Sequence, residues 1–234
     1  MSTVLLLRHG LTPMTGPVLA GRTPGVHLDE RGQAQAAAVA QRLSALPITT
    51  IVTSPLERCT ETAEAVRAVQ RAAGRDPAWE SDQRLVECGY GEWTGRQLKD
   101  LAKDPLWRLV QSQPSAVRFP GGESIAEMSA RSVRAVREWD ATLGPDAIWL
   151  ACTHGDVIKA ILADALSLHL DHYQRIVPDP CSVSIVRYTE TRPYVLRTND
   201  TGGDLSSFAP PARKRRRSRS SDATIGGGAG GGGV

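Results

Sequence analysis

Cationic side chains follow several short apolar runs of this chain. Arg8 and His9 come directly after TVLLL, and His154 comes directly after AIWLACT. Arg58 lies one turn into the helix that should follow the β-branched run ITTIVT. If these runs are parallel strands, their carboxyl ends meet at one edge of a sheet, where α/β proteins bind ligands. The four side chains can each carry positive charge, so their convergence predicts a bound anion.

Phosphate is the anion that best fits these residue types. Arginine forks donate paired hydrogen bonds to phosphate oxygens, and helices starting after Ser54 and near Gly155 point amide groups at the same edge. A neutral imidazole such as that of His9 is a nucleophile toward phosphorus. A solvated loop histidine or a surface arginine would explain any one of these residues, but not their joint occurrence at strand ends.

Phosphoryl transfer from an alkyl phosphate also needs an acid, because the alkoxide leaving group is strongly basic. The glycine-rich segment CGYGEWTG and the residue before it offer two carboxyl groups, Glu87 and Glu92. The chain shows no carboxylate or histidine cluster with metal-ligand spacing, so we expect no metal and no other cofactor.

The elements that position these residues alternate between strands and helices. Runs that fit strands lie at 3–7, 48–53, 147–153, 182–188 and 193–198, with a short extended piece at 83–87. Helical patterns cover 30–45, 55–73, 96–112, 123–142 and 155–166, with an interruption near Pro105. Asp29 and Ser54 are expected as N-caps, and Pro55 suits a first helical turn. Repeated strand–helix units predict an α/β fold with a largely parallel sheet.

The C-terminal segment differs in composition from the rest of the chain. Residues 211–234 hold six of the 28 basic residues and one of the 25 acidic residues, and seven of the last nine residues are glycine. We therefore predict a folded catalytic domain over 1–203 and a disordered basic, glycine-rich tail over 204–234. The near-neutral body argues against a nucleic-acid surface on the folded domain. The basic run KRRRSRS leaves the alternative that the tail binds nucleic acid or an acidic surface.

Six ordered motifs make the chain similar to the histidine phosphatase superfamily, also called phosphoglycerate-mutase-like. They span about residues 3 to 199 and read LLLRHG, GR with LDERGQAQA, SPLERCTETAEAV, RLVECGYGEWTG, FPGGES and CTHGDVIKA. The resemblance implies a three-layer α/β/α sandwich with a mostly parallel central sheet. It also implies that His9 carries the phosphoryl group and that Glu87, rather than Glu92, is the proton donor.

By the same resemblance, Arg8, Arg58 and His154 stabilise the transferring group, and Thr15, Arg22 and Gly155 help to bind phosphate or substrate. Two positions depart from the pattern of many members. Leu11 stands where they have an acidic residue, and Thr15 stands where an asparagine often binds the phosphate.

The function predicted from these residues is metal-independent hydrolysis of a small phosphorylated metabolite through a phosphohistidine. A phosphoglycerate-type phosphomutase and a catalytically silent phosphate-binding relative are the alternatives. A mutase must exclude water and usually needs extra closing segments, whereas this body has only a short insert at 96–120. Trp93, Trp107 and Phe119 either line a pocket for an organic phosphate or belong to the core.

The rest of the sequence favours a cytoplasmic protein. No apolar run approaches the roughly 20 residues of a membrane span, and the start MSTVLLLRHG is not typical of a secretory signal. The four cysteines, Cys59, Cys88, Cys152 and Cys181, show no CxxC pair, so we expect free thiols that pack as small apolar groups. Homodimer formation is left open.

Overall fold

A computed structural model describes residues 2–202 of the chain, and the predicted tail at 204–234 lies outside the described residues. Within residues 2–202 the strands form one six-stranded sheet with the order β3-β2-β4-β1-β5-β6. The strands are β1 (Ser2–Arg8), β2 (Thr50–Thr53), β3 (Ala78–Ser81), β4 (Ile148–Thr153), β5 (Val183–Tyr188) and β6 (Pro193–Asp200). The first four in this order pair in parallel, and β5 and β6 are antiparallel additions. The predicted mostly parallel sheet is confirmed.

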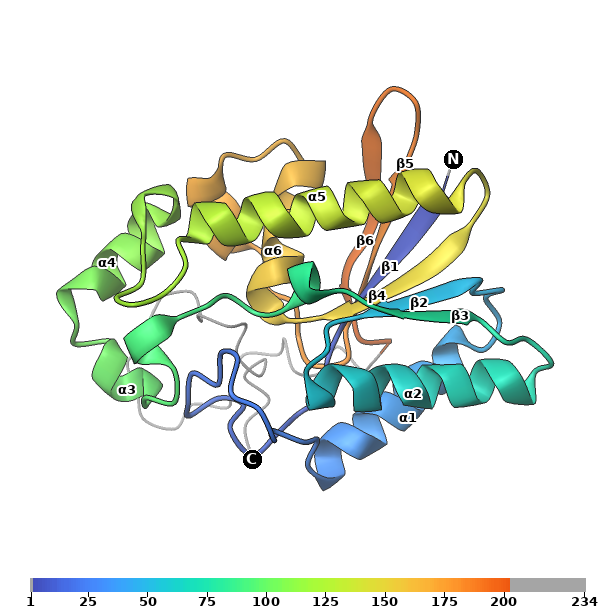
Figure 1. Ribbon diagram of the computed structural model, residues 1–234, viewed down its shortest axis with the longest axis horizontal. Helices are drawn as coiled ribbons and strands as arrows, with labels where there is room; N and C mark the ends of the chain where they lie inside the picture. Colours follow the sequence, from blue (N-terminus) through green and yellow to red (C-terminus); the bar gives the residue numbers. More distant parts are fainter. Residues whose placement is uncertain (1, 203–234) are drawn as a thin grey trace, which may run out of the picture.

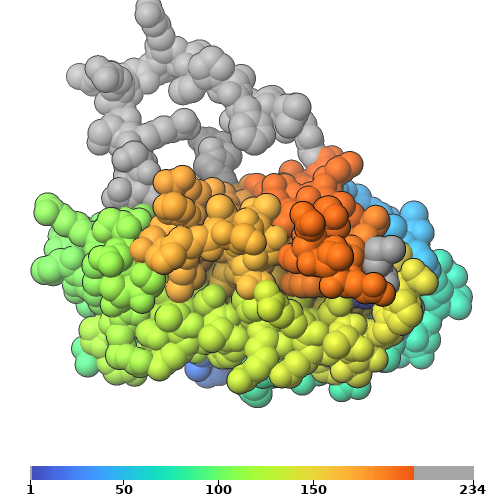
Figure 2. Space-filling view, turned by 90° about the horizontal axis from the view of Figure 1, so that it is seen from above, coloured from blue at the N-terminus to red at the C-terminus, as the bar shows by residue number. Residues whose placement is uncertain are grey.

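Helices cover both faces of the sheet (Figure 1). On one face lie α1 (Glu30–Leu43) and α2 (Glu57–Ala72), and on the other α5 (Ile125–Leu143) and α6 (Gly155–Ala165). The short helices α3 (Leu98–Leu101) and α4 (Pro105–Ser112) lie to one side, and four 3₁₀ turns complete the described elements: η1 (Gln83–Leu85), η2 (Gly91–Trp93), η3 (Pro114–Ala116) and η4 (Leu170–Arg175). Seen from above, α5 and the β5–β6 hairpin form much of this face, with the segment of α3 and α4 at its left (Figure 2).

Strand β1 is apolar from Val4 to Leu7 because it is buried on both faces. Successive side chains of a strand point to opposite faces. Val4 and Leu6 pack in the core under α5 and α6, whereas Leu5 and Leu7 pack with α1 and α2. The continuous run therefore forms two cores, and the first polar residues after it appear where the sheet ends.

Two glycines let the chain leave β1 and pack directly against α1. A Cβ atom added at Gly10 would lie 2.7 Å from the carbonyl oxygen of Gly32, and one added at Gly32 would collide with that of Leu11. Asp29 caps α1, as predicted, by accepting a hydrogen bond from the Gly32 amide at 2.7 Å. This contact sets the position of the loop that follows His9.

Three local predictions were wrong. Helix α2 has Leu56 at its N-cap with no side-chain cap, because the Ser54 hydroxyl instead lies 2.8 Å from His154 Nε2. The segment expected to be extended at 83–87 begins with the 3₁₀ turn η1, which Asp82 caps. Strand β3 was missed, since an edge strand that is mostly exposed has no apolar run. The interruption before Pro105 is confirmed as the break between α3 and α4.

Candidate active site at the strand ends

The sheet brings the four predicted cationic residues together. Arg8 ends β1 beside Thr153, the last residue of β4, and His9 and His154 follow these two strands. The two imidazole rings lie 5.2 Å apart between centroids. Arg58 lies in the first turn of α2, with its guanidinium NH2 group 3.5 Å from His154 Nδ1. These four residues, called here the strand-end cluster, are all buried, and His9 is the most exposed at 6%.

The hydrogen bond of His9 defines which ring nitrogen is free. His9 Nδ1 lies 2.8 Å from the carbonyl oxygen of Gly10. A carbonyl only accepts, so Nδ1 carries the proton and Nε2 of the neutral ring keeps its lone pair. Burial, with the positive charges of Arg58 and Arg8, holds the pKa of His9 well below its usual value. The ring is therefore neutral near pH 7, which is the form that attacks phosphorus.

The two arginines are anchored by backbone carbonyl groups. Arg8 donates to the carbonyl of Pro178 at 2.8 Å, and Arg58 donates to that of Gly21 at 2.6 Å. Arg58 Nε is buried and has no hydrogen-bond partner among residues 2–202. A buried donor of this kind is costly unless a ligand satisfies it. Phosphate oxygens supply such an acceptor.

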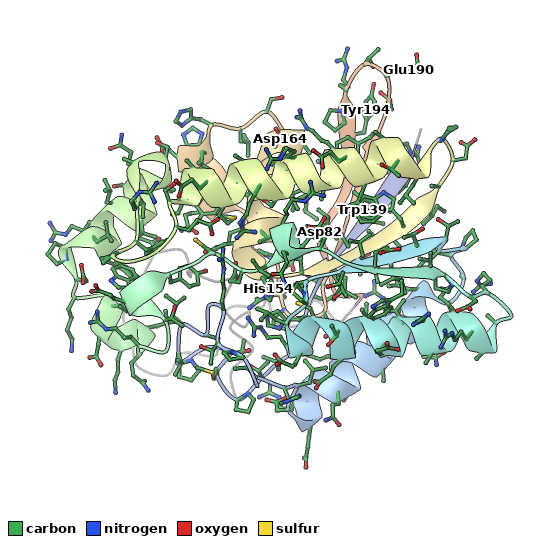
Figure 3. The ribbon with its side chains drawn as sticks, viewed as in Figure 1. Asp82, Trp139, His154, Asp164, Glu190 and Tyr194 are labelled. Atoms are coloured by element: carbon green, nitrogen blue, oxygen red, sulfur yellow. The ribbon has the colours of Figure 1, made fainter. Side chains whose placement is uncertain are left out.

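His154 is held from two sides. Arg58 can only donate to its Nδ1, so in the neutral ring the proton resides on Nε2 and is donated to Ser54 Oγ. Burial and the nearby Arg58 hold the pKa of His154 well below its usual value. Figure 3 shows His154 in the interior of the molecule.

Glu87 is the carboxyl group of the same pocket. It is 4% exposed and lines the pocket with Arg8, His9 and Arg58. Burial, reinforced by the negative charge of Asp156, raises the pKa of Glu87 to about 7, although the Cys88 amide donates to its Oε1 at 2.9 Å. Glu87 is thus poised to hold a proton near neutral pH.

The other candidate carboxyl group, Glu92, lies in η2 with an exposed side chain and does not line this pocket. The pocket is instead completed by residues of the loop after β1, by Tyr90 and by Leu98.

Comparisons with known proteins identify the family of this chain. Residues 4–201 match the histidine phosphatase superfamily (branch 1). The chain belongs to this superfamily. It is 33% identical over 217 residues to a probable phosphoglycerate mutase GpmB of Cronobacter sakazakii, covering 91% of this chain and 97% of that protein. It is 28% identical over 213 residues to phosphoserine phosphatase 1 of Hydrogenobacter thermophilus, covering 86% and 93%.

A solved structure shows the same fold. The mycobacterial glucosyl-3-phosphoglycerate phosphatase superposes with a TM-score of 0.74 at 26% identity, covering 84% of this chain and 98% of that one. That enzyme has also been solved with inorganic phosphate. The predicted three-layer fold and family are therefore confirmed.

Contacts from distant parts of the chain hold residues 82–93, called here the Glu87 segment. Thr153 donates to the carbonyl of Leu85 at 2.6 Å. Trp139 of α5 donates to Asp82 at 2.8 Å, and both side chains are labelled in Figure 3. The carbonyl of Glu87 accepts from Arg22 Nε at 2.8 Å and from Arg131 NH2 at 3.0 Å.

Glu123 joins these two arginines. Its carboxylate accepts from Arg22 at 2.7 Å, from Arg131 at 2.6 Å and from the Gly89 amide at 3.0 Å. Arg22 therefore holds the backbone of Glu87 and does not line the pocket with the other predicted residues. Sequence reasoning missed Arg131, which lies inside an ordinary amphipathic helix. The motif FPGGES, which contains Glu123, contributed to the family resemblance, but the sequence analysis assigned no role to Glu123.

A buried ion pair behind the pocket was also missed. Asp156 accepts from the Tyr90 hydroxyl at 2.7 Å and lies 3.2 Å from Lys159 Nζ. Lys159 donates to Gln174 at 2.9 Å. Asp156 and Lys159 are each 1% exposed. Because Asp156 lies two residues after His154, the start of α6 places a negative charge beside Glu87.

The remaining predicted residues have mixed outcomes. Thr15 lines the pocket, with its hydroxyl 2.9 Å from that of Thr12. Gly155 begins α6 and is buried behind His154. Trp93, Trp107 and Phe119 pack together in the core, so the alternative that they line a substrate pocket was wrong.

Three findings concern other predicted features of the described residues. The four cysteines are free and buried. Within residues 2–202, no group of three or more histidine, cysteine or acidic side chains is placed to hold a metal ion. In the same range, every helix is too short or too polar to cross a membrane.

Proposed function

We propose that this protein is a phosphomonoester hydrolase that forms a phosphohistidine at His9. The observation that carries the proposal is the hydrogen bond from His9 Nδ1 to Gly10, which directs the proton away from Nε2. Nε2 is then a nucleophile beside two anchored arginines and a buried carboxyl group.

In the first step, His9 Nε2 attacks phosphorus and the bond from phosphorus to the leaving oxygen breaks. The Glu87 carboxyl group gives its proton to that oxygen, and the alcohol departs. In the second step, the Glu87 carboxylate takes a proton from water while the water oxygen attacks phosphorus. The phosphorus–nitrogen bond breaks, phosphate is released, and His9 and Glu87 return to their starting forms.

The strand-end cluster supplies the electrostatic stabilisation in both steps. Arg8 and Arg58 face the phosphoryl oxygens with donors already held in place, so little reorganisation accompanies the charge shift. A bound dianion opposes the effect of the arginines on His154 and favours its protonated form. His154 then donates to the phosphoryl group from Nδ1. These cations do what a metal ion does in other phosphatases, and we propose that no metal is required.

Hydrolysis is favoured over mutase activity by the same features that the sequence indicated. The segment between η2 and α5 consists of the short elements α3, α4 and η3, whereas a mutase must keep water away from its phosphoenzyme. Among the relatives, phosphoserine phosphatase 1 and glucosyl-3-phosphoglycerate phosphatase bear phosphatase names, while the GpmB relative is named a probable mutase. A small phosphorylated metabolite is the proposed substrate.

The test is phosphate release from a panel of phosphomonoesters in excess EDTA, with interconversion of 3- and 2-phosphoglycerate measured beside it. We expect phosphate release that chelation leaves unchanged, and a base-stable, acid-labile phosphate on His9 during turnover. Isomerisation faster than phosphate release would assign the protein to the mutases. Loss of activity on chelation, restored by Mg²⁺ or Zn²⁺, would contradict the metal-free mechanism.

A further inference from the structure

The pocket changes in character between its base and its mouth. One part is lined by Arg8, His9, Arg58 and Glu87, which all act on the phosphoryl group in the proposed function. The other lining side chains are uncharged: Tyr90, Thr12 and Thr15 carry hydroxyl groups, and the apolar ones are Val18, Leu19 and Ala20 after β1 and Leu98 at the start of α3. These four apolar residues offer a leaving group a surface to pack against.

This apolar wall, formed by Val18, Leu19, Ala20 and Leu98, is held in place by backbone pairing. The amide of Leu19 donates to the carbonyl of Arg96 at 3.0 Å, and the amide of Gly95 donates back to Leu19 at 2.8 Å. The amide of Leu98 donates to Pro17 at 2.9 Å, and Val18 forms an antiparallel bridge with Gln97. Two segments almost 80 residues apart in sequence thus form one small ladder. The wall is part of the fold rather than a loose loop.

In the proposed function, the phosphoryl group engages every cation at the base of the pocket. Arg8 and Arg58 are the permanent cations, and the free enzyme keeps His9 and His154 neutral. Among the described residues that line the pocket, there is no further lysine or arginine. Arg22, the nearby arginine predicted to bind substrate, is committed to Glu123 and to the Glu87 carbonyl.

A second anionic group on the substrate would therefore meet an unfavourable environment. Beside the apolar wall, a carboxylate would lose water without gaining a cation or a charged donor, which costs free energy. Asp156, behind Tyr90, is paired with Lys159, so this buried pair offers no free cation to the pocket. A hydroxyl or an alkyl group in the same place loses little, and an alkyl group gains by burial against the leucines.

We propose that this site, given the hydrolase activity proposed above, selects phosphomonoesters whose leaving group is uncharged and partly apolar, and discriminates against those that carry a carboxylate. The proposal separates this chain from relatives whose names refer to phosphoglycerate, phosphoserine or glucosyl-3-phosphoglycerate.

A matched pair of substrates tests the selection. Glycerol 3-phosphate and 3-phosphoglycerate differ only in a hydroxymethyl group against a carboxylate, and 3-methylbutyl phosphate adds an apolar leaving group. At pH 7 we expect kcat/KM for glycerol 3-phosphate to exceed that for 3-phosphoglycerate by about tenfold or more, with 3-methylbutyl phosphate at least as good. Equal or better hydrolysis of 3-phosphoglycerate would overturn the selection. p-Nitrophenyl phosphate serves as the separate check of hydrolase activity, and its failure would reject the proposed function instead.

A charge placed on the wall provides the converse test. Leu98→Arg adds the missing cation, and Leu98→Gln is the matched control, being polar and uncharged. We expect Leu98→Arg to raise the kcat/KM ratio of 3-phosphoglycerate to glycerol 3-phosphate by about three- to tenfold, and Leu98→Gln to leave it near the wild-type value. The ratio cancels any general loss of activity, and Val18→Arg, from the facing segment, repeats the test if the first variant fails to fold. An unchanged ratio in both arginine variants would contradict the proposal.

Discussion

The strand-end cluster and the Glu87 segment supply the two halves of the proposed reaction, but different forces hold them. Arg8, His9 and His154 lie directly after strands of a parallel ladder, so the hydrogen bonds of the sheet determine where they are. The Glu87 segment is only a pair of 3₁₀ turns with irregular backbone between them. Side chains of β4 and α5, together with Arg22 from the loop after β1, hold it in place.

Because of this difference, we expect the position of His9 to tolerate substitutions elsewhere, whereas the protonation of Glu87 should depend on the side chains that hold its segment. Changing the strand-end cluster should remove chemistry without unfolding the protein, because the sheet does not depend on these side chains. Changing the supports of the Glu87 segment should alter protonation and leaving-group dependence while the nucleophile stays in place.

The largest expected effect is on the nucleophile. His9→Ala should lower kcat by roughly 10³-fold or more on both alkyl phosphates and p-nitrophenyl phosphate, since the covalent route is removed for every substrate. Thermal unfolding and circular dichroism should match the wild type. If the variant kept more than a few per cent of wild-type kcat, the proposed phosphohistidine would be wrong.

The acid should show a different pattern. Glu87→Gln should lower kcat on an alkyl phosphate by about 10²–10⁴-fold, the usual contribution of a positioned acid. The loss on p-nitrophenyl phosphate should be much smaller, because nitrophenolate leaves without a proton. Glu92→Gln is the matched control and should show no such dependence. Equal losses on both substrates in Glu87→Gln would assign this residue to binding or folding.

The supports of the Glu87 segment should give an intermediate effect. Arg131→Met removes the hydrogen bonds that the Arg131 guanidinium donates to the carbonyl groups of Arg84 and Glu87 and to the Glu123 carboxylate. We expect the free energy of unfolding to fall by about 1–3 kcal/mol, because these acceptors are partly buried.

In the same variant, kcat should fall more on an alkyl phosphate than on p-nitrophenyl phosphate. Arg134→Met is the control on the same helix, since the Arg134 side chain is exposed and its ion pair with Glu138 is long at 4.0 Å. An identical loss on both substrates would show that Arg131 does not act through Glu87.

The smallest expected change is a displacement of the pH profile. The raised pKa of Glu87, about 7, means that kcat for alkyl phosphates should fall as the pH rises through this value and the acid loses its proton. Asp156→Asn removes a nearby negative charge, which lowers the pKa of Glu87. The falling limb should then move to lower pH by on the order of one unit.

The profile for p-nitrophenyl phosphate provides the control, since it should lack this limb in both proteins. A limb that stays in place while kcat drops equally at every pH would mean that Asp156 is only structural.

Much of the fold and of the strand-end cluster was predictable because both arise from local patterns. Apolar runs buried on both faces have a recognisable length and composition, and the polar residues that end them, such as Arg8 and His154, are next to them in sequence. The same local signals identified Asp29 as a cap and the break before Pro105. They failed at β3, whose exposed side chains have no such pattern. They also failed at Ser54, whose hydroxyl hydrogen-bonds to His154 instead of capping α2.

The amino-acid sequence by itself determined most of the strands and helices and the functional residues that follow them, since hydrophobic periodicity and capping act over a few residues. Only the tertiary structure decided that Arg22 turns to the Glu87 backbone, that Arg131 and Glu123 join it, and that Asp156 lies beside the acid. These contacts join residues that lie from 34 to more than 60 positions apart. Each contact depends on sheet register and helix packing, which bring together charged side chains that are far apart in sequence, and no local sequence pattern specifies such a contact.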